Sequence, residues 1–225
     1  MLIFLDIETT GLTSLDKICF ISIISDEFCA DEYVFEGKKI SAEASSKNFI
    51  TNEMLKGGVK FQDTTAYRFL SQHNNPDTTL VLHDSEFVLE YLKRSSFTWC
   101  GDVIDTKQVS KHLIGECEQF SLRFLRYELK LYKDEQQAEI RCGIKNAFTI
   151  KLLFEYLLEL ESLDKIKELS YKNILLSKIN FGKHNGKYIE EIVANDPKYL
   201  YWLLNQNDLD GDLRYSIEYY LGDGL

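Results

Sequence analysis

Two carboxylates stand two positions apart near the start of the chain, directly after the apolar run Leu2-Ile3-Phe4-Leu5. The run predicts a buried strand, and side chains alternate across a strand, so Asp6 and Glu8 should project from one face. Two acids held side by side on a buried strand repel each other unless a cation lies between them. The following Thr9-Thr10-Gly11 predicts a turn that ends the strand and lets a ligand backbone approach closely. The segment therefore predicts half of a divalent-metal site.

A pair of acids in this spacing also fits a solvated strand edge, but the full octet is more specific. Leu5-Asp6-Ile7-Glu8-Thr9-Thr10-Gly11-Leu12 resembles the first motif of the DEDD superfamily of 3′–5′ exonucleases, in its DEDDh branch. The resemblance implies that Asp6 and Glu8 hold a pair of Mg²⁺ ions, which activate water for phosphodiester hydrolysis. It also implies that Thr9, Gly11 and Leu12 contact the nucleic acid.

Two later segments depart from the family pattern at the positions that would do chemistry. In His83-Asp84-Ser85-Glu86-Phe87-Val88, the last residue stands where the family has its third metal-binding acid. In Arg141-Cys142-Gly143-Ile144-Lys145-Asn146-Ala147, Arg141 replaces the general-base His and Asn146 replaces the last acid. Valine has no metal-binding atom, and arginine stays protonated at any ordinary pH. Asp84, about one helical turn before Val88, is either a displaced substitute ligand or a helix cap.

These substitutions change what the resemblance implies for activity. Two carboxylates cannot balance two divalent cations, so at most one Mg²⁺ or Mn²⁺ ion is expected to bind, weakly, through Asp6, Glu8 and the Asn146 carbonyl oxygen. Hydrolysis from the 3′ ends of single-stranded DNA or RNA is expected to be weak or lost, as in a pseudoenzyme. The alternative is a non-catalytic scaffold that binds nucleic acid or a protein partner.

The composition excludes some classes of protein. The 225 residues carry a formal net charge of −10, with 44% hydrophobic and 28% charged residues. Because Lys and Arg supply most non-specific affinity for nucleic acid, this charge argues against a general nucleic-acid coat but permits a local grip on a short strand. No apolar run reaches the roughly 18 residues of a membrane helix. Five scattered cysteines form neither a metal-binding pattern nor a disulfide framework, which predicts a reduced, cytoplasmic protein.

The elements that must position these residues follow from hydrophobic periodicity. Strands are expected at 2–5, 18–25, 32–35, 80–82 and 102–105, a polar loop with a helix at 42–55, and helices at 61–70, 85–92, 106–114, 121–129 and 144–169. Helices alternating with strands after an initial meander indicate an α/β fold with a mixed sheet. The resemblance implies a ribonuclease-H-like domain over 1–170, in which Asp105 caps a helix.

A second domain is expected at 173–225. Phe181-Gly182-Lys183-His184-Asn185-Gly186-Lys187 is followed by Asp196-Pro197-Lys198-Tyr199-Leu200-Tyr201-Trp202. The two segments together resemble the C-terminal module of exodeoxyribonuclease-X-like nucleases, which implies a small α+β module with a tight glycine hairpin. The aromatic residues are expected to form its core. In the functional alternative, Lys183, His184, Lys187 and Lys198, with Tyr199, contact a nucleic-acid backbone.

Overall fold

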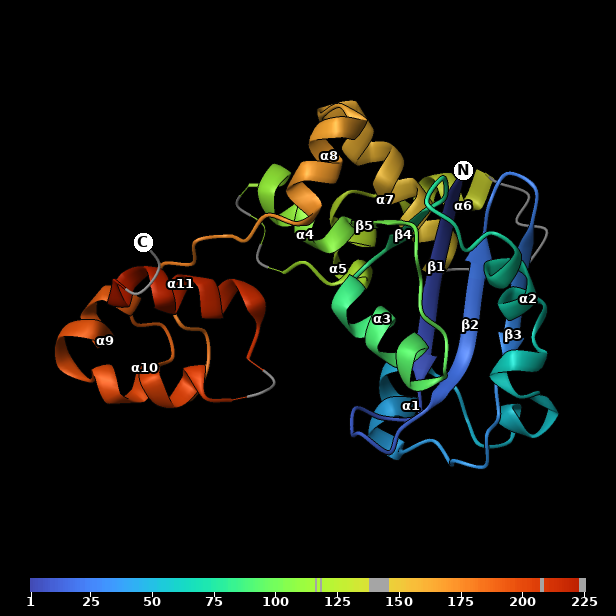
Figure 1. Ribbon diagram of the computed structural model, residues 1–225, viewed down its shortest axis with the longest axis horizontal. Coiled ribbons are helices and arrows are strands. Elements are labelled where there is room, and N and C mark those ends of the chain that lie inside the picture. The colour runs from blue at the N-terminus through green and yellow to red at the C-terminus, as the bar shows by residue number, and fades with distance from the viewer. Residues whose placement is uncertain (116, 118, 138–145, 207–208, 223–225) are drawn as a thin grey trace. The chain divides into compact units, whose positions relative to one another are not determined.

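The computed structural model describes residues 1–225 except 116, 118, 138–145, 207–208 and 223–225. The chain divides into two compact units, Met1–Ser170 and Tyr171–Leu225. The larger unit contains the acid pair and is an α/β structure built on one sheet (Figure 1).

The sheet has five strands in the order β3-β2-β1-β4-β5. Their bounds are Leu2–Thr9 for β1, Ile18–Ile24 for β2, Cys29–Tyr33 for β3, Thr79–Leu82 for β4 and Asp102–Asp105 for β5. The first three strands form an antiparallel meander, and β4 and β5 join β1 in parallel. The predicted mixed sheet with an opening meander is confirmed, and β1 is its central strand.

Helices connect and cover the strands. The first half of the unit contains α1 Ala42–Asn48, two 3₁₀ turns at Met54–Gly57 and Phe61–Asp63, α2 Thr65–Gln72 and α3 Ser85–Arg94. The second half contains α4 Thr106–Leu113, α5 Leu122–Glu128, α6 Tyr132–Gln137, α7 Asn146–Leu160 and α8 Leu163–Ser170. The helix expected at 144–169 is therefore two helices, because the chain turns after α7 and the Ser162 side chain accepts from the Lys165 backbone N–H to begin α8.

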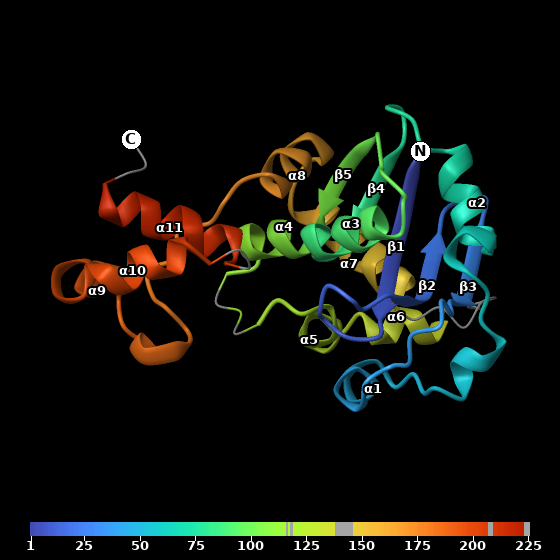
Figure 2. The same cartoon turned by 60° about the horizontal axis from the view of Figure 1, so that its bottom comes forward.

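Residues of β1 alternate between two hydrophobic cores. Ile3, Leu5 and Ile7 are buried in a cluster with residues of α2 and α3. Phe4 packs on the opposite face in a cluster with residues of α4 and α7, where its ring lies 5.6 Å from that of Phe154. Because alternate strand residues share a face, the acids after Phe4 lie on the α7 side. Figure 2 shows α1 and α5 near the carboxyl end of β1.

The smaller unit is mostly helical. It contains a 3₁₀ turn at Gly182–His184, α9 Ile189–Asn195, α10 Pro197–Leu204 and α11 Gly211–Leu221. The expected glycine hairpin is present: Lys178 pairs with Tyr188 in an antiparallel bridge, and Gly186 has a φ of 82°.

The expectation of an aromatic core in the smaller unit is wrong. Its buried core is aliphatic and comprises Ile179, Ile189, Ile192, Leu200, Leu203, Leu213 and Ile217. Tyr201 and Trp202 are 49% and 56% exposed because they lie on α10 next to Leu200 and Leu203, which face inward. Within the described part of the whole chain, no helix is both long and apolar enough to cross a membrane.

Candidate active site

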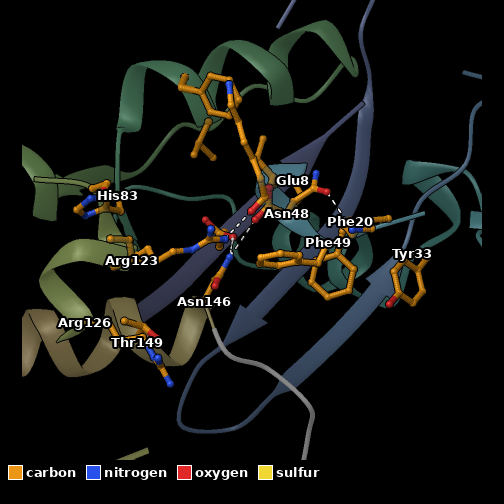
Figure 3. A pocket seen from close by; sticks show the side chains of 18 of the residues that line it. Glu8, Phe20, Tyr33, Asn48, Phe49, His83, Arg123, Arg126, Asn146 and Thr149 are labelled. Carbon is orange, nitrogen blue, oxygen red and sulfur yellow. Dashed lines mark hydrogen bonds between the residues drawn. The ribbon is translucent and has the colours of Figure 1, made fainter. Parts of the chain in front are cut away.

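The predicted acids and the substituted asparagine come together although 138 residues or more separate them in the sequence. Asn146 is the first residue of α7, which starts against the carboxyl end of β1. Its Nδ2 donates to Asp6 Oδ2 at 2.9 Å and to Glu8 Oε1 at 3.1 Å (Figure 3). The side-chain amide thus bridges the two carboxylates. The sequence predicted that the carbonyl oxygen of Asn146 faces the space between Asp6 and Glu8. In the structure its N–H group faces that space instead.

Burial makes ionisation of these two acids unfavourable. It raises the pKa of Asp6 to about 7, with a further contribution from the neighbouring Glu8 carboxylate. Burial also raises the pKa of Glu8, although the Asn48 side chain, the Arg123 charge and Asn146 act in the opposite direction. Burying two neighbouring acids lowers the stability of the fold when they are ionised. Such an arrangement is typical of a functional site.

Asp6→Asn should therefore stabilise the chain at alkaline pH. Because the pKa of Asp6 is raised from 3.8 in the unfolded chain to about 7 in the folded one, the carboxyl group takes up a proton on folding at any pH between these values. Its cost to the free energy of unfolding therefore grows as the pH rises from about 4 to about 7 and stays constant above that. The variant should gain about 2–4 kcal/mol over the parent at pH 8 and little at pH 4. Urea denaturation in EDTA measures this, with the exposed Asp77→Asn as the control. An equal gain at both pH values would contradict the burial argument.

A cleft of about 1000 Å³ opens over the acid pair. Its lining includes both acids and Asn146, and Val88 borders it from α3. Val88 is 2% exposed and belongs to the hydrophobic cluster on the other side of β1. At the position of the third family acid, the cleft wall is therefore hydrophobic.

Basic and aromatic side chains complete the cleft. Arg123 on α5 has its guanidinium 5.1 Å from the Phe49 ring centroid, and its Nη2 donates to the Lys47 backbone carbonyl at the end of α1. Phe20 and Tyr33 form a neighbouring pair with ring centroids 5.2 Å apart. Figure 3 shows these rings on one side of Asn146 and Arg123 on the other.

Sequence reasoning missed these cleft residues. Arg123 and Arg126 belong to the helix expected at 121–129, and both line the cleft. Their i, i+3 spacing puts them on one helix face. The same spacing was the signal that could have found them.

The structure does not bring Asp84 to the cleft. Its carboxylate accepts from Lys107 Nζ at 2.5 Å, and it is absent from the cleft lining. The alternative expectation that it caps α3 is also wrong, because its side chain makes no capping hydrogen bond. The cap of α3 comes from Asp105, whose carboxylate accepts from the Ser85 backbone N–H at 2.7 Å. Asp105 also caps α4, as predicted. His83 lines the cleft but is engaged structurally, with Nδ1 3.0 Å from Thr106 Oγ1.

The loop after β1 is shaped by its own contacts. A Cβ at Gly11 would lie 2.6 Å from Asp16 Oδ2, so a larger residue there would displace the Asp16 carboxylate. The Thr9 hydroxyl is buried and donates to the Gly11 carbonyl. Leu12 is 70% exposed. None of the three predicted contact residues (Thr9, Gly11 and Leu12) is among the residues that line the cleft.

In the smaller unit, an acid engages two of the predicted contact residues. Asp196 Oδ2 accepts from Lys183 Nζ at 2.6 Å and lies 2.9 Å from His184 Nε2. These two partners, Lys183 first, lower the pKa of Asp196 to about 2. Lys187 and Lys198 are exposed.

The described residues do not fit a pair of divalent ions. They contain no group of three or more His, Cys, Asp or Glu side chains that could hold a metal. Between Asp6 and Glu8, the position that a cation would take, the Asn146 side chain presents N–H donors, and an N–H group cannot ligate a metal. Arg141, at the position of the general base, lies outside the described residues.

The sequence is similar to known exonucleases in its C-terminal segment and over nearly its whole length. Residues 179–208 match the family "Exodeoxyribonuclease X-like C-terminal". Exodeoxyribonuclease 10 of Escherichia coli (strain K12) is 23% identical, covering 98% of this chain and 99% of its own length. The resemblance to the DEDD 3′–5′ exonucleases is confirmed. The resemblance covers nearly the whole chain and includes the C-terminal segment that matches the exodeoxyribonuclease-X-like family.

Solved structures confirm the ribonuclease-H-like fold. Exonuclease X in complex with 5′ overhanging duplex DNA is 18% identical with a TM-score of 0.52, covering 76% of this chain and 99% of that one. A 3′-exonuclease described for 3′-end recognition of histone mRNA stem-loop is 13% identical with a TM-score of 0.51 over 70% of this chain and 63% of its own. E. coli exonuclease I with an oligonucleotide is 15% identical with a TM-score of 0.53 over 74% and 42%.

Proposed function

We propose that this chain binds the 3′ ends of single-stranded DNA or RNA in the cleft and hydrolyses them weakly or not at all. The observation that carries the proposal is the Asn146 amide, whose Nδ2 donates to both Asp6 and Glu8. An exonuclease of this superfamily would place metal-bound charge at that point to activate water. Here a neutral amide donates one hydrogen bond to each carboxylate instead.

The walls of the cleft support binding without cleavage. Arg123 and Lys47 bring positive charge to the rim, and Phe20, Phe49 and Tyr33 offer aromatic faces on which bases can stack. Stacking tolerates any base, which fits a cleft that grips a strand end rather than reading its sequence. With a net charge of −10, the grip has to be local and should weaken steeply with salt.

A binding and turnover assay tests the proposal. Purified chain in Mg²⁺ or Mn²⁺ should raise the fluorescence anisotropy of a labelled single strand with a free 3′ end, while gel analysis shows little shortening. Arg123→Gln should weaken binding by about tenfold and lower the slope of log Kd against log salt by about 0.7. Arg94→Gln is the matched control, because Arg94 pairs with Glu90 outside the cleft.

Two outcomes would overturn parts of this proposal. Rapid, metal-dependent shortening of the strand by the unmodified chain would show that hydrolysis persists. No binding to either DNA or RNA would leave the exonuclease fold as a scaffold for a protein partner. The cytoplasmic location and the binding of at most one weakly held Mg²⁺ or Mn²⁺ ion stay predictions.

A further inference from the structure

Three oxygen-bearing side chains form a row across the strands β1, β2 and β3, next to the acid pair. Asp6 is paired directly with Ser22, and Ser22 is paired directly with Asp31. Directly paired residues on neighbouring strands project from the same face of a sheet. The serine therefore lies between two carboxylates, on the face of the sheet that carries Glu8 (strands in Figure 1).

The polar atoms of this row are buried and lack protein partners. Ser22 is 1% exposed, and neither its Oγ nor Asp31 Oδ1 has a partner in hydrogen-bonding geometry among the described residues, although the two side chains lie close enough for Ser22 to offset part of the rise that burial causes in the pKa of Asp31. Buried polar atoms in native proteins are nearly always satisfied, by protein, water or an ion. An ion or a water that contacts both oxygens would satisfy them together.

The electrostatics of the row favour a positive occupant. The carboxylates of Asp6 and Asp31 project from the same face of the sheet, one on each side of Ser22. The ion pairs formed between described residues include neither acid. Among the residues that the structure describes, no Lys or Arg therefore gives these two carboxylates the compensation that buried acids usually have.

We propose that Asp6, Ser22 and Asp31 form a divalent-cation site, displaced by one strand from the space between Asp6 and Glu8. All three ligands are hard oxygens, which suit Mg²⁺, Mn²⁺ or Ca²⁺, with water completing the coordination. The proposed site is compatible with the position of Asn146. Asn146 occupies the space between Asp6 and Glu8, and Asp6 can share a cation with Asp31 on its other side. It does not depend on nucleic-acid binding.

Terbium luminescence tests this site in the free protein. Tb³⁺ takes oxygen ligands like Ca²⁺, and Tyr33, two positions beyond Asp31 on the same strand face, can transfer excitation to it. The full chain should give a saturable Tb³⁺ signal that Mn²⁺ competes away. Asp31→Asn and Ser22→Ala should each raise the apparent Kd, the loss of the carboxylate by about 10–100-fold.

Two variants separate this site from the alternatives. Asp26→Asn, the same change at an exposed carboxylate in the turn between β2 and β3, should leave the Kd unchanged. Glu8→Gln should change it by less than about threefold, since in this proposal Glu8 is not a ligand and acts only through screened charge. Circular dichroism checks folding, and Asp31→Asn decides the question if Ser22→Ala does not fold.

The proposal is overturned by either of two results. One is that neither Tb³⁺ nor Mn²⁺ binds the unmodified chain. The other is that Glu8→Gln abolishes binding while Asp31→Asn leaves it unchanged, which would return the ion to the space between Asp6 and Glu8. Because no nucleic acid is present, these results are independent of whether the cleft binds a strand end.

Discussion

Restoring the family residues at three positions together should raise 3′–5′ hydrolysis by about three orders of magnitude or more. The variant combines Val88→Asp, Arg141→His and Asn146→Asp. General-base catalysis is worth roughly 10²–10⁴ in rate, and the added carboxylates would supply the charge needed to hold two metal ions. Replacing Asn146 also removes the amide donor that bridges Asp6 and Glu8.

Each change alone should have little effect on hydrolysis, because metals and base act as a unit and their effects are far from additive. Val88→Asp should also be destabilising without metal, since Val88 is 2% exposed within a hydrophobic cluster. Release of labelled nucleotides from a single strand, in Mg²⁺ or Mn²⁺, measures the gain. Asp6→Ala in the triple variant is the control and should abolish it. Strong Asp6-dependent cleavage by the unmodified chain would show that other residues carry the chemistry.

Local sequence patterns predicted most of the strands and helices. They also predicted that Asp6 and Glu8 lie together, but not which side chains contact them. Apolar runs and period-two alternation placed β1, β2 and β4, since such patterns report burial on a strand directly. The spacing of Asp6 and Glu8 was enough to predict that they share a face. The break between α7 and α8 was missed because an apolar helical pattern continues through a Ser162 cap.

Contacts between distant segments could not be predicted in this way. A residue type does not say which end of its amide faces a partner, so Asn146 was expected to offer an oxygen and instead donates hydrogen. The row of Asp6, Ser22 and Asp31 depends on strand register, which is fixed by pairing rather than by any one segment. Arg123 reaches the cleft because of where α5 packs. In each case tertiary structure decides the role of the side chain.

Asp105→Ala should destabilise the larger unit by about 3–5 kcal/mol, a large part of the stability of a typical domain. Asp105 is 8% exposed, and its carboxylate accepts from four backbone N–H groups at the starts of two helices. On the α3 side, the donors are Asp84 at 3.2 Å and Ser85 at 2.7 Å. On the α4 side, they are Lys107 at 2.9 Å and Gln108 at 3.2 Å. A single helix cap is worth about 0.5–2 kcal/mol, and here one side chain caps two helices.

Urea denaturation followed by Trp99 fluorescence measures the loss, in a Trp202→Phe background so that the signal reports on the larger unit alone. Asp102→Ala is the matched control: Asp102 lies at the other end of β5 and forms an exposed ion pair with Lys167, worth at most about 1 kcal/mol. Asp105→Asn should fall between the two, because it keeps one acceptor oxygen but turns an N–H group toward a backbone donor. A loss in Asp105→Ala no larger than in Asp102→Ala would mean that α3 and α4 find other caps. The start of α3 carries Val88 and borders the cleft, so the same substitution should also loosen that wall.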